Sequence, residues 1–268
     1  MFIKKLEAAQ ENNNSLVCVG LDPNIDKINA LGVGLDDWLT AIVDATAPHA
    51  CAFKPQIAYF AALQAEDELA DIIDYIHANH PHIPVILDAK RGDIGTTAAQ
   101  YASEAFDRYD ADAVTVNPYM GGDTLLPYSE RADKGVVVLC KTSNAGSGEL
   151  QNLTLDNGHK LFEQVAINAN KDWNDNNNLL LVVGATYPEE LKKIRSLAGN
   201  MPFLIPGIGA QGGDVKATLV AGLREDGKGL IISSSRGIIY AGDSAADFAE
   251  KAQQACKELK KLINLYRV

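Results

Sequence analysis

Three closely spaced charged residues are the part of the sequence best suited to chemistry. Asp88 and Lys90 stand two positions apart, and Asp93 follows shortly after them. If Asp88 and Lys90 belong to a strand, their side chains point to the same side. Carboxylates beside an ammonium group keep it protonated, which suits a lysine that must deliver a proton. The alternative is a buried ion pair with a structural role only, because such pairs also shift titration without doing chemistry.

A second group of residues is suited to binding an anion. A glycine-rich segment, residues 207–213, contains Gln211, and Arg236 follows the next apolar run. Glycines allow a backbone to approach a ligand closely. The guanidinium group of arginine offers a planar fork that matches a phosphate. The combination predicts a phosphate site, whereas the glycine-rich segment alone could be a surface turn.

Eight short apolar runs, separated by helical segments, must position these residues. The runs are continuous rather than alternating, as expected for parallel strands that helices cover on the outside. Between them, residues such as Leu69, Ile72, Ile73 and Ile76 share one helical face. Eight such units predict a (β/α)8 TIM barrel, formed as a single domain by residues 1–268. The expected strands are 16–21, 51–54, 85–89, 113–116, 136–141, 179–183, 203–205 and 230–234.

The alternative architecture is a doubly wound open sheet. No G-x-G-x-x-G segment follows the first expected strand, which disfavours it. In a barrel the active site lies at the C-terminal ends of the strands. Charged groups there are costly to bury unless they are paired, so their presence itself indicates a site. The polar residues at these ends are Asp22, Lys54, Asp88, Lys90, Asn117, Lys141, Thr142, Ser143, Ser235 and Arg236, and the longest expected loop is 143–157.

Composition excludes several classes of protein. The net charge of −11 over 268 residues argues against a nucleic-acid-binding surface. No run of about 18 apolar residues predicts a membrane span, and the charged N-terminus lacks a signal segment, so we expect a cytoplasmic protein. The four cysteines contain no C-x-x-C pair and are expected to be small buried apolar residues. Three histidines between positions 77 and 82 lack a fourth ligand at a suitable spacing, so no metal site is expected.

The segment D-x-K-x-x-D-I-x-x-T, residues 88–97, resembles the signature of the orotidine 5'-phosphate decarboxylase family. The resemblance extends over residues 20–240, and the residues at 91–92 and 95–96 are similar to the bacterial long-chain subgroup, type 2. One departure is Ala145, where the family pattern has proline. The other similar segments, in the same order, are Gly20-Leu21-Asp22-Pro23, Phe53-Lys54-Pro55, Lys141-Thr142-Ser143-Asn144, residues 206–213 beginning at Pro206, and Ser235-Arg236.

The resemblance implies a reaction and roles for the charged residues. The reaction would be the conversion of orotidine 5'-monophosphate to uridine 5'-monophosphate and carbon dioxide in de novo pyrimidine biosynthesis, without metal or organic cofactor. Lys90 would protonate C6 of the pyrimidine as carbon dioxide leaves, and Asp88 would lie beside the departing carboxylate. Lys54 and Asp22 would hold the ribose.

The resemblance also implies a homodimer with shared active sites. Asp93, Ile94 and Thr97 would reach into the site of the partner subunit. The remaining substrate-binding residues that the resemblance implies are Ser143 for the base, Gln211 and Arg236 for the phosphate, and Pro206 and Ser235 from the neighbouring segments.

Two other functions are alternatives to the nucleotide decarboxylase. Relatives that act on keto-sugar phosphates share the row of Asp88, Lys90 and Asp93, but the family pattern implies that they use a metal and lack a lysine like Lys54. A non-catalytic sensor of a phosphate ligand would need Arg236 but not the charged row, whose burial is costly without a purpose. Lys54 and the charged row therefore favour the nucleotide decarboxylase.

Overall fold

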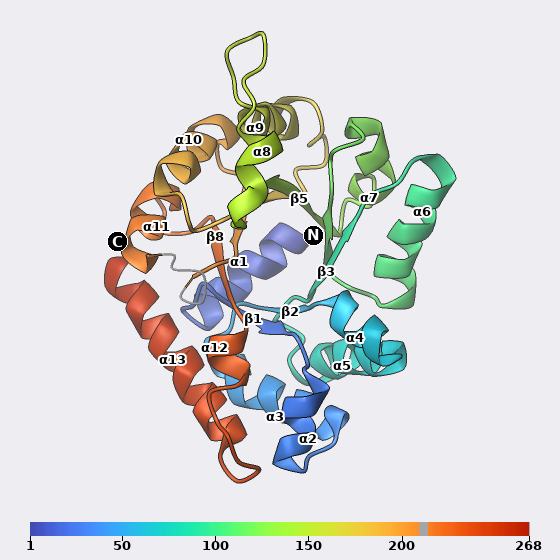
Figure 1. Ribbon diagram of the computed structural model, residues 1–268, viewed down its shortest axis with the longest axis vertical. Helices are drawn as coiled ribbons and strands as arrows, with labels where there is room; N and C mark the ends of the chain where they lie inside the picture. Colours follow the sequence, from blue (N-terminus) through green and yellow to red (C-terminus); the bar gives the residue numbers. More distant parts are fainter. Residues whose placement is uncertain (209–213, 268) are drawn as a thin grey trace.

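Eight parallel strands form the centre of the computed structural model, which describes residues 1–208 and 214–267. Adjacent strands follow the order β2-β1-β8-β7-β6-β5-β4-β3. Two isolated parallel bridges, Phe53 with Val85 and Gln56 with Asp88, join β2 to β3 and bring the sheet round into a barrel (Figure 1). The predicted (β/α)8 barrel is confirmed, and a doubly wound open sheet is wrong. The strands are β1 (Val17–Leu21), β2 (Ala52–Pro55), β3 (Ile86–Arg91), β4 (Ala113–Val116), β5 (Gly135–Lys141), β6 (Leu179–Val183), β7 (Phe203–Ile205) and β8 (Leu230–Ser234).

Helices surround these strands (Figure 1). The predicted apolar face of the helix before β3 is confirmed, since Leu69, Ile72, Ile73 and Ile76 are all buried. Three acidic residues in the first turn of this helix favour its start, because they complement the helix dipole. The longer helices are α1 (Phe2–Asn12), α2 (Ile25–Leu31), α3 (Leu35–Thr46), α4 (Ile57–Leu63), α5 (Glu66–Asn79), α6 (Gly95–Ser103), α9 (Leu161–Lys171), α10 (Pro188–Ala198), α11 (Val215–Gly222) and α13 (Phe248–Tyr266). The short helical segments are η1 (Ala47–His49), η2 (Glu104–Arg108), η3 (Gly122–Leu125), α7 (Leu126–Ser129), η4 (Ala145–Ser147), α8 (Gly148–Gln151) and α12 (Arg236–Ile239).

The strands are buried on both faces, which explains why they are continuous apolar runs. Their outward side chains pack against the helices in the larger of two apolar clusters. The smaller cluster fills the barrel interior, and two residues of α1 close its lower end. Its members include Phe2 and Leu6 of α1 and one residue of each strand: Cys18, Ala52, Ile86, Ala113, Val137, Leu180, Leu204 and Ile231.

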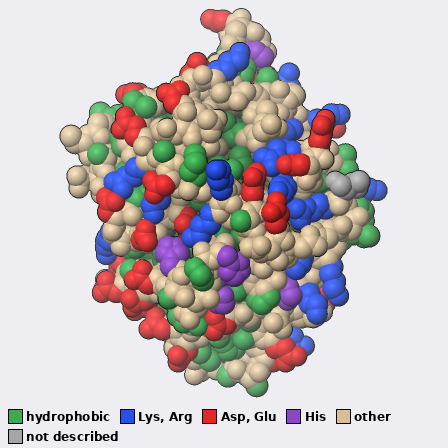
Figure 2. All heavy atoms as spheres, turned by 180° about the vertical axis from the view of Figure 1, so that it is seen from behind, with side chains coloured by type: hydrophobic (Ala, Val, Ile, Leu, Met, Phe, Trp, Pro, Cys, Tyr) green, Lys and Arg blue, Asp and Glu red, His purple; other side chains and the backbone are tan. Residues whose placement is uncertain are grey.

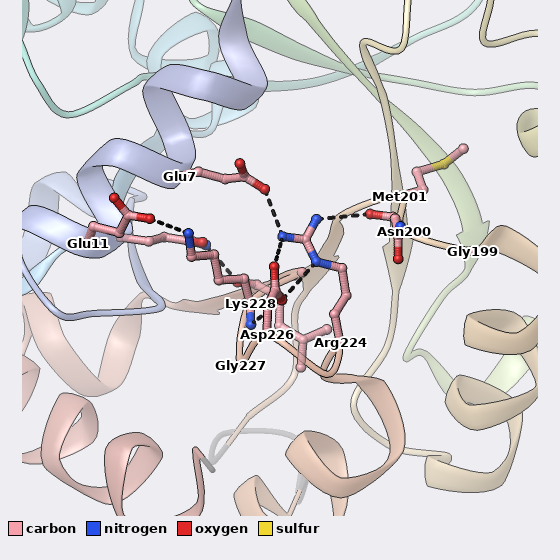
Figure 3. A network of polar contacts seen from close by, with 12 residues as sticks. Glu7, Glu11, Gly199, Asn200, Met201, Arg224, Asp226, Gly227 and Lys228 are labelled. Atoms are coloured by element: carbon pink, nitrogen blue, oxygen red, sulfur yellow. Dashed lines mark hydrogen bonds and ion pairs between the residues drawn. The ribbon is translucent and has the colours of Figure 1, made fainter.

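Ion pairs hold α1 against the end of the barrel where the strands begin. The guanidinium of Arg224, in the loop before β8, donates to Glu7 Oε1 at 2.8 Å and also to Asp226. Lys228 in the same loop pairs with Glu11 (Figure 3). These charges hold the base of the barrel together and lie at the end opposite to the C-terminal ends of the strands.

The histidines and cysteines lie in surroundings typical of residues with a structural role. Figure 2, which views the molecule from behind, shows histidines beside acidic and basic side chains. His77 Nε2 lies 3.1 Å from Asp112 Oδ2, and His80 Nε2 lies 2.8 Å from Asp44 Oδ1. The four cysteines are free and buried, as predicted. In the described part of the chain, no three His, Cys, Asp or Glu side chains are grouped to hold a metal ion, and no helix is long and apolar enough to cross a membrane.

The segment between β5 and α9 is more ordered than predicted. We expected a loop over residues 143–157, but η4 and α8 form within it. Ala145 is the first residue of η4, and Asn144 before it has an extended backbone. A proline is favoured at this first position, yet the turn forms with alanine. Beyond α8, a bridge between Thr154 and Lys160 closes a projecting loop (Figure 1).

Candidate active site

Lys54, Asp88 and Lys90 form a row of alternating charge at the ends of β2 and β3. Lys54 Nζ donates to Asp88 Oδ2 at 2.8 Å, and Lys90 Nζ donates to Asp88 Oδ1 at 2.6 Å. The side chains of Lys54 and Asp88 are 8% and 10% exposed, whereas that of Lys90 is 46% exposed. Asp88 therefore holds one buried and one accessible ammonium group, and only Lys90 is open to the mouth of the barrel.

The buried pair remains charged at neutral pH. Burial alone disfavours the ionised form of Asp88, but Lys54 and Lys90 outweigh it, so the pKa of Asp88 lies well below its usual value. Burial likewise disfavours protonated Lys54, but the attraction of Asp88 and Asp22 raises its pKa above the usual value. A fixed carboxylate is thus held beside the accessible ammonium group of Lys90.

Thr115 of β4, which was not among the expected site residues, also contacts this row. Its hydroxyl donates to Asp88 Oδ1 at 2.9 Å and accepts a hydrogen bond from the backbone N–H of Lys90 at 2.8 Å. Threonine is common in strands, so its presence in an apolar run carried no signal. A polar residue one position before the end of an expected strand was the only available hint.

A cavity of about 430 Å³ lies beside the row, at the ends of β1, β2, β7 and β8. Gly20 at the end of β1 permits the approach of β8, because a Cβ there would lie 2.8 Å from Ser235 Cβ. The Oγ atom of Ser235 is buried and has no hydrogen-bond partner among the described residues, and Arg236 next to it is exposed. Gln211 lies outside the described residues. The lining residues are Asp22, Lys54, Pro206, Gly207, Ile208, Ser233, Ser234, Ser235, Arg236 and Gly237.

Asp22 lines the same cavity and has an unused acceptor. Its Oδ1 atom is buried and has no hydrogen-bond partner within residues 1–208 and 214–267. Its backbone carbonyl accepts from the Tyr240 hydroxyl at 2.7 Å, which fixes the end of β1. An unpaired buried carboxylate oxygen is costly, so this atom is suited to accept a hydrogen bond from a bound hydroxyl group.

A second cavity, of about 560 Å³, lies by the ends of β4 and β5. Leu139, Asn117 and Thr142 contribute to its lining. Ser143 follows Thr142 and packs on Gly184 at the end of β6, where a Cβ would lie 2.9 Å from Ser143 Cα. Gly184 is therefore needed to bring the segment carrying Ser143 against the barrel.

Lys141 has a different place from the other polar residues at the strand ends. An irregularity in the β5–β6 pairing after Leu139 accompanies its position opposite Val183. Its buried Nζ donates to Ser147 Oγ at 3.1 Å and to Asn152 Oδ1 at 2.9 Å. Lys141 thus fastens the segment after β5 to the barrel and does not join the charged row.

Asp93, Ile94 and Thr97 lie on the loop after β3 and at the start of α6. Asp93 Oδ1 accepts from the backbone N–H of Ile94 at 2.8 Å, and Ile94 and Thr97 are exposed. Among the described residues, no ion pair joins Asp93 to Lys90 of the same chain. Within the described part of one chain, the carboxylate that pairs with Lys90 is that of Asp88.

The chain is similar to known proteins over almost its whole length. Residues 15–251 match the model of the orotidine 5'-phosphate decarboxylase / HUMPS family. The chain is 56% identical, over 99% of both chains, to an orotidine 5'-phosphate decarboxylase of Dechloromonas aromatica. It resembles the structure of Leishmania donovani OMP decarboxylase with a TM-score of 0.86 and 42% identity, over 99% of this chain and 98% of that one. It also resembles Leishmania donovani UMP synthase with a TM-score of 0.88 and 43% identity, and 99% of this chain spans 56% of that longer chain. The chain therefore belongs to the orotidine 5'-phosphate decarboxylase / HUMPS family.

Proposed function

We propose that this protein is a carboxy-lyase that converts orotidine 5'-monophosphate to uridine 5'-monophosphate and carbon dioxide, in the biosynthesis of pyrimidines. The observation that carries the proposal is the row formed by Lys54, Asp88 and Lys90 at the mouth of the barrel. Full-length similarity to orotidine 5'-phosphate decarboxylases supports the same reaction.

Lys90 is the proton donor in the proposed mechanism. Loss of carbon dioxide leaves an electron pair on C6, and the pyrimidine ring offers no position that can accept it. An ammonium group fixed near C6 stabilises that charge without reorganising and then transfers its proton to the carbon. Asp88, kept ionised by its two lysines, lies beside the substrate carboxylate and disfavours it relative to carbon dioxide. The mechanism uses no metal or organic cofactor.

The remaining site residues bind the substrate in this proposal. The buried Oδ1 of Asp22 accepts a hydrogen bond from a ribose hydroxyl group, and Lys54 donates to the ribose. Binding of the distant phosphate supplies energy that orients the reacting carbon. Ser143 contacts the base, while Pro206, Gln211, Ser235 and Arg236 surround the phosphate.

The loss of orotidylate absorbance in the presence of purified protein tests the proposed function. We expect turnover with stoichiometric formation of uridylate, and the same rate after dialysis against EDTA, because the proposed chemistry needs only side chains. A protein that is inactive on orotidylate contradicts the proposal. Activity that disappears with EDTA and returns with Mg²⁺ would favour the metal-dependent reactions of keto-sugar phosphates instead.

Arg236→Ala is expected to remove only the contribution that the substrate's phosphate makes to binding. Removal of a charged fork should lower kcat/KM for orotidine 5'-monophosphate by about 100-fold. Activity on orotidine, which lacks the phosphate, should stay the same. Gln211→Ala should change activity in the same direction, and Arg108→Ala, at an exposed position on η2, is the matched control. An Arg236 variant equally impaired on both substrates would show that Arg236 does not bind the phosphate.

In the proposed homodimer, the loops after β3 and β4 of one subunit contact those of the partner, and this contact completes each active site. Ile94, Tyr119 and Met120 expose 61%, 79% and 43% of their surface on these loops. The loops adjoin, since a Cβ at Gly92 would lie 3.7 Å from Met120 Cε. Exposed apolar groups of this kind mark a surface for a partner. Asp93 and Thr97 border them and would enter the partner's site.

We also infer that residues 1–268 form one domain in the cytoplasm. Packing of α1 under the barrel and of α13 against its outer surface supports one domain, because both terminal helices share its apolar clusters. Four free, buried cysteines are in keeping with a reducing compartment.

A further inference from the structure

Thr115 lies inside the barrel, one layer above the apolar cluster that fills it. It is fully buried and stands two residues after Ala113 on β4, so the two side chains share the inner face. Val137 of β5 is its partner in the sheet. Its hydroxyl group is therefore enclosed among apolar neighbours and directly below the charged row.

The hydroxyl group of Thr115 makes all three hydrogen bonds that a hydroxyl group can make. It accepts from the backbone N–H groups of Ala89 at 3.0 Å and Lys90 at 2.8 Å, and it donates to Asp88 Oδ1 at 2.9 Å. A hydroxyl group has one proton to donate and two lone pairs to accept with. Three contacts to three consecutive residues of one strand thus converge on one oxygen atom.

The irregular backbone of β3 explains why these contacts are needed. In the β3–β4 pairing, Leu87 stands opposite Val114, but the next paired residue of β3 is Arg91, opposite Val116. Residues 88–90 therefore lie opposite Thr115 alone, and its hydroxyl replaces the backbone acceptor of a regular ladder. Lys90 has a φ of 47°, a left-handed conformation that is costly for a residue with a side chain and persists only when its surroundings hold it.

The same hydroxyl also fixes the carboxylate of the row. Asp88 Oδ1 receives both Lys90 Nζ and Thr115 Oγ1, while Oδ2 receives Lys54 Nζ. The carboxylate is held at both oxygens and cannot rotate without breaking one of these bonds. Lys90 is thereby held twice, by its backbone N–H and by the carboxylate that its ammonium group contacts.

We propose that Thr115 is a positioning residue for proton delivery, which holds the strained backbone of Lys90 and the plane of the Asp88 carboxylate. The inference rests on the proposed decarboxylase function. Thr115 acts on the reacting carbon through Lys90 and Asp88, whereas the phosphate and ribose contacts lie on other strands. Its loss should therefore slow turnover and leave nucleotide affinity intact.

Thr115→Val tests this, because valine keeps the shape of threonine and removes the hydroxyl group. We expect kcat to fall by about 10- to 100-fold, as for the loss of hydrogen bonds to charged groups, with KM and the Kd of uridylate changed less than threefold. Thr115→Ser, which keeps the hydroxyl, should recover most of the lost kcat. Thr115→Cys, whose thiol forms only weak hydrogen bonds, should behave like the valine variant and replaces it if valine prevents folding.

Thr46→Val is the matched control. Thr46 is also fully buried, but its hydroxyl donates to Ile42 O within α3, at 2.7 Å. Both valine variants should unfold at a lower temperature, and only the one at position 115 should lose kcat. If wild type is active and Thr115→Val retains kcat within threefold, the positioning role is wrong. If kcat falls, KM rises with it and serine does not rescue either, the role is structural only. Inactive wild type would instead overturn the proposed function, and this inference with it.

Discussion

Lys90→Ala is expected to lower the turnover of orotidine 5'-monophosphate by about four orders of magnitude while the protein stays folded. The variant loses both the proton donor and the fixed positive charge near C6. Lys90 is the accessible ammonium group of the row, and Asp88 keeps its buried partner Lys54 in the variant. The pair that is costly to break therefore remains, and the fold should tolerate the change.

The measurement combines steady-state decarboxylation with circular dichroism and thermal unfolding. Lys193→Ala, at an exposed position on α10, removes a lysine far from the strand ends and should leave turnover unchanged. Uridylate should still bind to Lys90→Ala, because the phosphate and ribose contacts are intact. A folded variant that retains a tenth of wild-type turnover would contradict the proton-donor role.

Mixing two inactive variants is expected to restore activity. If Asp93 serves the partner's site, Lys90→Ala and Asp93→Ala homodimers are each nearly inactive for different reasons. In a hybrid, one site collects both defects and the other has an intact Lys90 and an intact Asp93. Random equal mixing places about half of the dimers in hybrid form, so activity should reach about a quarter of wild type.

The position of Asp93 is the structural reason to expect this recovery of activity. The carboxylate contacts the neighbouring backbone N–H of Ile94 and lies beside exposed apolar side chains. Subunit exchange should be confirmed separately, for example by native mass spectrometry of tagged chains. The control mixture, Lys90→Ala with Lys90→Ala carrying a second tag, should stay inactive. If exchange is complete and activity does not recover, Asp93 acts within its own chain.

The barrel could be predicted from the sequence because its pattern is local. Both faces of every strand are buried, so each strand is a continuous apolar run whose limits can be read along the chain. The expected and observed strands differ by at most two residues at any end. The charged row was also predictable, since Asp88 and Lys90 follow one apolar run and Lys54 ends another, and charges at such positions must be paired.

Other features of the site depend on contacts between distant segments. The spacing of Asp88 and Lys90 suggested a regular strand, yet the pairing with β4 is interrupted there and Lys90 has a left-handed backbone. Thr115 is 25 residues from Lys90 in the sequence and meets it only because β3 and β4 are neighbours in the barrel. Threonine, like valine, is enriched in strands, so no local pattern distinguishes it.

Tertiary structure also decided which polar residues work together. Lys141 is the last residue of β5 and Lys54 lies one residue before the end of β2, but Lys141 contacts Ser147 of η4 and Asn152 after α8, away from the row. Asp22, whose buried Oδ1 has no partner in the described part of the chain, lines a cavity that forms where the ends of β1, β2, β7 and β8 come together. Residue types and spacing along one strand determined which groups could do chemistry, whereas strand register around the barrel decided which of them meet, because register is a property of pairs of strands.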